Sequence, residues 1–267
     1  MASLHDQLDG LEPPMSGGNE PAASSADSVA DPQATDAARR SSRDRIIDAA
    51  MELFHQNGYT ATGISAILKR ASVNSGSLYH FFPTKEDLLL ALLERYKELL
   101  YPAVMDPVFS RVTDPIERIF GVLDGYRQML IATGCSLGCP IGNLALELSD
   151  THPAVRRGIA ENFDGWKNAI RACLDEAADR FPTDLDRESL ASFVLTVMEG
   201  GMMQAKAHKT LTPFDAAVTQ LRDYVDRLLA DGGEWSRPRR TAEAPPDEDA
   251  PDRIQPPDAW RDPNARA

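Results

Sequence analysis

The sequence has few cysteines, no long apolar run and fewer basic than acidic residues, and each shortage excludes a class of protein. Three cysteines (Cys135, Cys139 and Cys173) among 267 residues are too few, and odd in number, for a disulfide scaffold. No apolar run approaches the roughly 18 residues of a membrane-spanning helix, so we expect no membrane partner. Met1 to Gly10 lack the basic and apolar segments of a secretory signal, which predicts a cytoplasmic protein.

Motifs for metal, cofactor or catalytic chemistry are also lacking. The five histidines are scattered, and none stands at metal-ligand spacing from a cysteine. Neither a G-x-S-x-G motif nor a glycine-rich phosphate loop occurs. We therefore expect no metal and no cofactor. Cys139 and Ser149, with Asp150 and His152 nearby, are the candidate parts of an enzyme, but residues 149–153 have the composition of an interhelical loop, so the enzyme hypothesis ranks last.

The distribution of charge matters more than its total. The net charge of −13 argues against a nucleic-acid partner. Residues 1–38, however, hold seven acidic and no Lys or Arg residues, whereas residues 39–85 hold seven basic against three acidic residues, a net charge of +4. Salt screens charges separated by more than about 10 Å, so a local basic face can bind an anion whatever the rest of the chain carries.

Composition divides the chain into four parts. Residues 1–38 and 232–267 are rich in Pro and polar residues and have few large apolar side chains, which predicts disordered tails. Between them, apolar residues recur at helical spacing without a strand-like alternation, so the fold class is all-α. We expect a helix-turn-helix domain over 39–88 and a helical sensing and dimerisation domain over 89–231.

The first domain shows helices near 42–57, from Gly63 onward, over 75–81 and over 84–100. Thr62 is expected to cap the second helix, and Leu78 and Phe81 to turn the third inward. The opposite face of the third helix would then carry small or hydrogen-bonding side chains toward a DNA groove. Arg43 and Arg45 could contact the flanking backbone. A small helical bundle with a solvated face fits the same pattern.

The segments Ile46–Phe54, Asn57–Tyr59, Thr62–Ile64 and Ser75–Leu88 resemble the N-terminal domain of the TetR/AcrR family of regulators. The resemblance implies a homodimer whose paired recognition helices, residues 75–81, read a palindromic double-stranded DNA operator. Ser72 stands where the family usually has Gly in the turn, and Asn74 where it usually has Ser. Taken together, pattern and resemblance give these candidate DNA contacts: Arg43, Thr62, Gly63, Ser75, Ser77, Tyr79, His80 and Lys85.

Further helices are predicted near 114–133, 140–149, 153–180, 186–209 and 213–231. Residues 138–148, a GC-x-x-GNLA-x-E segment, and residues 198–202 resemble one branch of the family, whose members are often repressors released by small ligands or reactive electrophiles. Aromatic, flexible apolar and a few polar side chains would line a cavity for this effector. The alternative is that they are plain core. The candidates are Phe120, Tyr126, Arg127, Cys139, Asn143, Phe163, Trp166, Met198 and Met202.

Cys139 precedes the helix that begins at Pro140, a position that lowers a thiol pKa and favours a redox or electrophile switch, with Cys135 as the resolving thiol. A buried, inert thiol is the favoured alternative.

Helices 186–209 and 213–231 are the expected dimer interface, a four-helix bundle with Gly200–Gly201 at a close approach. Their apolar stripes could instead face the subunit core. The predicted stripes are Leu190, Phe193, Val194, Val197 and Gly201, and Leu221, Tyr224, Val225, Leu228 and Leu229.

The function expected from all this is a ligand-responsive regulator. The resemblance favours a repressor that a small molecule or an electrophile releases from DNA. The alternatives left open are a transcriptional activator and a ligand-independent DNA-binding protein.

Overall fold

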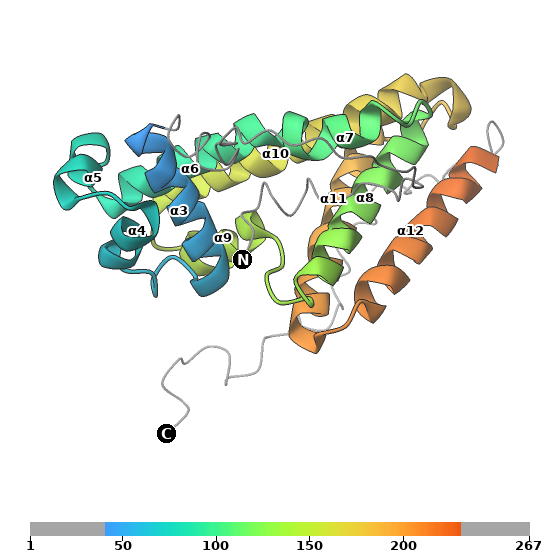
Figure 1. Ribbon diagram of the computed structural model, residues 1–267. Helices are drawn as coiled ribbons and strands as arrows, with labels where there is room; N and C mark the ends of the chain where they lie inside the picture. Colours follow the sequence, from blue (N-terminus) through green and yellow to red (C-terminus); the bar gives the residue numbers. More distant parts are fainter. Residues whose placement is uncertain (1–40, 231–267) are drawn as a thin grey trace, which may run out of the picture.

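The computed structural model describes residues 41–230, and within this range the chain forms helices joined by turns and loops and contains no strand (Figure 1). The all-α prediction is therefore confirmed. The tails predicted over 1–38 and 232–267 lie outside the described residues.

Three short or medium helices pack on the start of a fourth to form the first unit. They are α3 (Ser42–Asn57), α4 (Ile64–Ala71) and α5 (Ser75–Phe81), and the fourth is α6 (Lys85–Leu99). Ile46, Ile67, Leu78 and Leu88 have no exposed surface, so each helix contributes an anchor to one core. The Asn74 side chain accepts from Ser77 N (2.8 Å) and caps α5, the good N-cap expected of Asn at this position.

Two local predictions for this unit are wrong. Gly63, not Thr62, is the N-cap of α4; Thr62 is 3% exposed, and its hydroxyl donates to the carbonyls of Leu53 (3.2 Å) and Gly58 (2.7 Å). Phe81 is 38% exposed, while Phe82 is 3% exposed. The reason is that α5 ends at Phe81, and the extended backbone of Phe82 (φ −136°, ψ 93°) turns the second ring inward.

The rest of the described chain forms a second helical unit. The ranges expected from the sequence match the five longer helices to within four residues at each end, but the prolines near residue 105 concealed two short helical segments. Pro107 lies in the first turn of one of them, where a missing N–H is tolerated. The elements are η1 (Leu100–Met105, a π-helix), α7 (Asp106–Phe109), α8 (Pro115–Ala132), α9 (Pro140–Leu148), α10 (Pro153–Glu176), η2 (Ala178–Arg180, a 3-10 turn), α11 (Arg187–His208) and α12 (Thr212–Ala230).

Helices α6 and α10 run side by side and join the two units. Figure 1 shows α3, α4 and α5 at one end of the molecule and α8, α11 and α12 at the other, with α9 next to α3. This arrangement puts α9 and α6 where a change in the second unit can reach the first.

The predicted interface stripes of α11 and α12 prove to be mixed. Leu190, Val194, Leu221 and Val225 are buried within the chain. Gly201 also faces inward, because an added Cβ would lie 3.0 Å from Cδ2 of Phe214. For these positions the core alternative is correct.

Two other residues of the predicted stripes, Phe193 and Tyr224, remain exposed and form an apolar face on the same two helices together with Met203. It contains Phe193 (45% exposed), Met203 (54%) and Tyr224 (38%), and the Phe193 and Tyr224 rings meet edge to face with centroids 5.8 Å apart.

Candidate DNA-binding surface and internal cavity

Helix α5 presents a polar face to solvent while one side chain anchors it. Leu78 is fully buried, whereas Ser75, Tyr79 and His80 are exposed and Ser77 is half-buried. Tyr79 is 53% exposed although it is aromatic, so its ring and hydroxyl are available to a partner. The surface expected from sequence thus exists, and its chemistry suits phosphate and base-edge contacts.

The residues around α5 are less uniform. Gly63 is exposed at the start of α4, and the Arg43 guanidinium lies 5.5 Å from the Phe82 ring centroid on an exposed surface. Thr62 is different, because its hydroxyl is buried and already hydrogen-bonded to two carbonyls. A contact from its side chain to DNA would require the loop to open.

The Lys85 side chain contacts Tyr59 in the α3–α4 loop. Its ammonium donates to Tyr59 O (2.5 Å) and lies 4.2 Å from the Tyr59 ring centroid. Burial lowers its pKa, and the Glu147 carboxylate opposes that shift. An ammonium has three N–H donors, so a phosphate contact from Lys85 remains a prediction that the carbonyl bond does not forbid.

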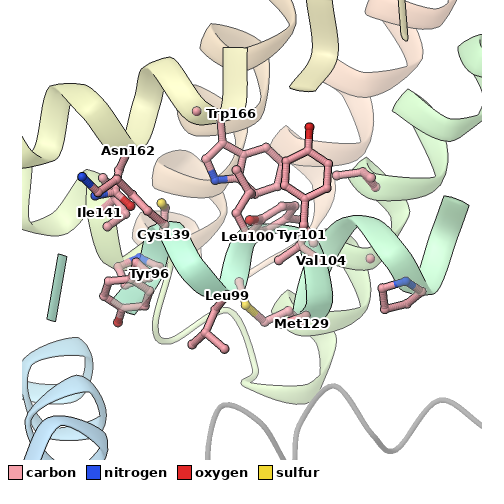
Figure 2. Close-up of a pocket in the computed structure, with 18 of the residues that line it drawn as sticks. Tyr96, Leu99, Leu100, Tyr101, Val104, Met129, Cys139, Ile141, Asn162 and Trp166 are labelled. Carbon is pink, nitrogen blue, oxygen red and sulfur yellow. The ribbon is translucent and has the colours of Figure 1, made fainter. Parts of the chain in front are cut away.

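A cavity of about 940 Å³ lies in the second unit and reaches α3 of the first unit; α6, η1, α7, α8, α9 and α10 form the rest of its wall (Figure 2). This volume is within the range of pockets for drug-sized ligands. Charged residues line part of its wall. The rest is aliphatic and aromatic with a few uncharged polar groups, and it includes Tyr96, Leu99, Leu100, Tyr101, Val104, Val122, Tyr126, Met129, Cys139, Ile141, Asn162 and Trp166.

Of the nine effector-site candidates, Tyr126, Cys139 and Trp166 line this cavity. The other six do not, because they lie on other faces or have partners. Arg127 pairs with Asp215 (2.8 and 3.1 Å). Asn143 donates to Leu137 O and accepts from Lys206. The Phe120 ring centroid lies 3.4 Å from the Arg222 guanidinium carbon. Met198 and Met202 are buried in α11, and Phe163 packs on the main core.

Several residues of the cavity wall were not predicted from the sequence. Leu100, Tyr101 and Val104 belong to η1, which the prolines concealed. Asn162 sits in the middle of an amphipathic helix, and its burial could not be distinguished from a solvent-facing position. Tyr96 shows a weak signal, since it is an aromatic residue among the charged residues at 94–98.

The cavity wall at Cys139 does not activate the thiol. Its Sγ caps α9 by accepting from Gly142 N (3.4 Å), as a helix N-terminus requires. Burial nevertheless raises its pKa well above the ordinary value, and the neighbouring Glu199 carboxyl adds to the rise. The expected lowering of the pKa is therefore wrong in direction, because desolvation outweighs the helix terminus.

Helix α9 also forms hydrogen bonds with the first unit. The Glu147 carboxylate accepts from Tyr59 N (2.9 Å) and Thr60 N (2.6 Å), two amides of the α3–α4 loop. These hydrogen bonds help lower the pKa of Glu147 against the opposing effect of burial. Just before α9, the Gly138 carbonyl accepts from Nε2 of the buried His55 (2.8 Å). The cavity wall and the α3–α4 loop thus share one short helix.

Two further expectations concern absences. Within residues 41–230, every helix is too short or too polar to span a lipid bilayer. In the same range, no three His, Cys, Asp or Glu side chains are grouped so that they could hold a metal ion.

Comparison with known proteins agrees with this architecture. Residues 46–92 match the model of bacterial regulatory proteins of the tetR family, and residues 115–221 match the tetracyclin repressor-like C-terminal domain. An uncharacterized HTH-type transcriptional regulator of Mycobacterium tuberculosis is 31% identical over 73% of this chain and 98% of its own length. The HTH-type transcriptional repressor DhaR of Mycobacterium sp. is 26% identical over 68% of this chain and 91% of its own.

Solved structures show the same fold. The regulatory protein TetR from Rhodobacter sphaeroides superposes with a TM-score of 0.63 at 25% identity, over 68% of this chain and 98% of that one.

Proposed function

Since the chain belongs to the TetR family of bacterial transcriptional regulators, we propose that it is a repressor that binds a palindromic operator as a homodimer and is released by a small molecule. The observation that carries this is the solvent-facing surface of α5, with Ser75, Tyr79 and His80 exposed over a buried Leu78. Two such helices related by a dimer axis would read half-sites about one DNA turn apart. Action on DNA implies a cytoplasmic location.

The dimer uses the exposed apolar face of α11 and α12. Phe193, Met203 and Tyr224 would be costly to leave in water as a group, and Gly200 lies on the same side of α11. Burial of this face against a second copy gives the four-helix bundle expected of these helices.

Release follows from occupancy of the cavity. A ligand shifts the balance between two conformations only by its differential affinity for them. Helices α6 and α8 border the cavity and carry the movement, and α9 couples it to the α3–α4 loop through Glu147. The result is a changed separation of the two α5 helices.

The chemistry of the cavity favours a reversible inducer over an electrophile. Cys139 is buried and its raised pKa keeps the thiol protonated, which slows attack on an electrophile. Repression rather than activation rests on relatives such as DhaR, which is named as a repressor.

The test is binding of the full chain to the DNA upstream of its own gene, by fluorescence anisotropy across a salt series. Tight, sequence-selective binding that weakens steeply with salt is expected. Tyr79→Ala should weaken operator binding at least about tenfold, the effect of losing one or two base or phosphate contacts. Ile131→Ala, which shortens a similarly exposed apolar side chain near the end of α8 and outside the cavity wall, is the control.

Equal losses in both variants, or weak binding indifferent to sequence in operator selection from genomic DNA, would contradict the proposal. Sedimentation of Phe193→Glu tests the dimer separately: a wild-type dimer and a folded monomeric variant are expected.

A further inference from the structure

The cavity has one polar side, and Asn162 defines it. This residue is 5% exposed, and its Nδ2 donates to Leu93 O (3.1 Å) and Gly158 O (2.9 Å). Because both neighbours are carbonyls, the amide can be oriented only with its NH2 toward them. Figure 2 shows Asn162 on the same side of the cavity as Cys139, Ile141 and Tyr96.

The carbonyl oxygen of Asn162 remains available to a ligand. In the described part of the chain, the fully buried side-chain nitrogen or oxygen atom that lacks a hydrogen-bond partner is Arg45 Nε. Asn162 Oδ1 accepts no hydrogen bond from the described residues, so it must keep some accessible surface. Because Asn162 lines the cavity, we infer that this surface faces the cavity. A buried acceptor of this kind costs stability unless a donor reaches it.

The phenol of Tyr126 lines the same cavity, and its ring packs on a neighbour of Asn162. Asn162 and Trp166 are one turn apart on α10, and the Tyr126 ring centroid lies 5.2 Å from that of Trp166. Within residues 41–230 the Tyr126 hydroxyl has no hydrogen-bond partner. Burial raises its pKa well above the ordinary value, and the nearby Cys139 and Glu199 add to the rise, so the group is a donor at neutral pH.

No buried charge faces this side. All the charged residues along the cavity wall keep solvent access, which places them toward its mouth: Asp44, Asp48, Glu52, Arg95, Lys97, Arg111, Asp124 and Glu161. Glu199 does not line the cavity; its carboxyl contacts the Cys139 thiol, and burial raises its pKa toward the neutral form. A ligand charge placed beside Asn162 would be desolvated without a counter-charge.

The other side of the cavity is apolar and aromatic. Figure 2 shows Trp166, Leu100, Tyr101, Val104 and Met129 around it. A flat or extended hydrocarbon body suits this wall, since methionine adapts to irregular shapes and aromatic rings stack.

Resting on the proposed role of this cavity as the effector site, we propose that the effector is an uncharged compound with an apolar, ring-containing body and an alcohol or phenol hydroxyl. The hydroxyl donates to Asn162 Oδ1 and accepts from the Tyr126 O–H. A hydroxyl does both, whereas a ketone or an ether would leave Asn162 unpaired. The body lies against Trp166 and Met129.

The test uses calorimetric titration of the full chain with matched biphenyl probes. They are 4-phenylphenol, 4-methylbiphenyl, 4-methoxybiphenyl, biphenyl-4-carboxylate and 4-phenylbenzylamine. We expect 4-phenylphenol to bind about tenfold more tightly than its methyl isostere, the net factor expected of its two hydrogen bonds together. The methoxy, anionic and cationic probes should bind more weakly than the phenol.

Variants locate the effect. Tyr126→Phe removes one of the two hydrogen bonds and leaves the bond to Asn162, so the advantage of the phenol over the methyl probe should fall to about threefold, whereas Tyr101→Phe on the apolar side should leave it unchanged. Gly125 lines the cavity on α8, and an added Cβ there would meet no described atom within 4 Å. Gly125→Phe should therefore abolish binding of all five probes, and Gly125→Ala should not.

Four outcomes would overturn the proposal: no binding of 4-phenylphenol at millimolar concentration, tighter binding of a charged probe, equal binding of the methyl probe, or an unchanged preference in Tyr126→Phe. Operator binding is measured in parallel. If 4-phenylphenol binds as expected but operator affinity does not change, the ligand class stands and the release proposed above fails.

Discussion

Ser72 ends α4 in the left-handed region (φ 54°, ψ 48°), a conformation that suits glycine. The family pattern has Gly at this position, so the sequence predicts a cost for Ser if the backbone has a positive φ. The backbone of Ser72 does have a positive φ. Ser72→Gly should raise the free energy of unfolding by up to about 1 kcal/mol, since the Cβ strain is lost and the added chain entropy offsets part of the gain. Urea denaturation with an unchanged slope would measure it.

The matched control is Ser65→Gly in the first turn of α4, which should destabilise by up to about 0.5 kcal/mol. Destabilisation by both variants would mean that the Ser72 side chain contributes more than its backbone costs.

His55 makes the stability depend on pH. Burial lowers its pKa below 6.5, and the nearby Lys206 lowers it further, against the hydrogen bond to Gly138 O. The unfolded chain therefore binds the proton first, so stability is present above about pH 6.5 and is lost as pH falls through 6.5 toward the folded-state pKa.

We expect the urea midpoint to fall between pH 7 and pH 5. In His55→Gln, whose amide can still donate to Gly138 O, that fall should be smaller. His208→Gln, an exposed change on α11, serves as the control. A wild-type midpoint that is constant over this range would refute the assignment.

At the scale of elements, periodicity located the longer helices, but it did not assign their faces. Helix α10 has a broad apolar face, and nothing in the sequence says that Trp166 borders a cavity while Phe163 packs in the core. The same ambiguity affected α11, where Phe193 and Val194 are adjacent but only Val194 is buried. Which apolar residues meet is decided by long-range packing, which a one-dimensional pattern does not contain.

The adjacent glycines of α11 offer a matched pair. At Gly201 an added Cβ would lie 3.0 Å from Cδ2 and 3.3 Å from Cα of Phe214, and the backbone atom cannot move without separating α11 from α12. At Gly200 it would meet no described atom within 4 Å. Overpacking by Gly201→Ala should therefore destabilise the fold by about 1–3 kcal/mol. The higher helix propensity of alanine offsets up to about 1 kcal/mol of this cost.

Gly200→Ala should be neutral or stabilising by up to about 1 kcal/mol in the subunit. Urea denaturation measures both variants, and sedimentation of Gly200→Leu reports whether this position lies at the dimer contact. Equal destabilisation by the two alanine variants would show that α11 and α12 do not pack as described.

At the scale of the molecule, the family and the helix-turn-helix could be predicted from sequence, because residues 43–90 carry a dense local motif. The connection between the units could not. Glu147 reaches the Tyr59 and Thr60 amides across 88 and 87 positions of sequence, and a carboxylate on α9 looks like any solvated charge until the fold brings it there.

Glu147→Gln tests this connection. The amide keeps one acceptor oxygen, but its NH2 would oppose the second backbone N–H, and the charge that strengthens both bonds is lost. Hydrogen exchange at Tyr59 and Thr60 should therefore accelerate severalfold, and operator affinity should fall because the loop that leads into α4 is less well held. Glu161→Gln, a glutamate of α10 paired with Lys97, removes the same charge away from the loop and should change neither property. Faster exchange with unchanged operator affinity would separate the loop from DNA binding; unchanged exchange would mean that the two hydrogen bonds do not hold the loop in solution.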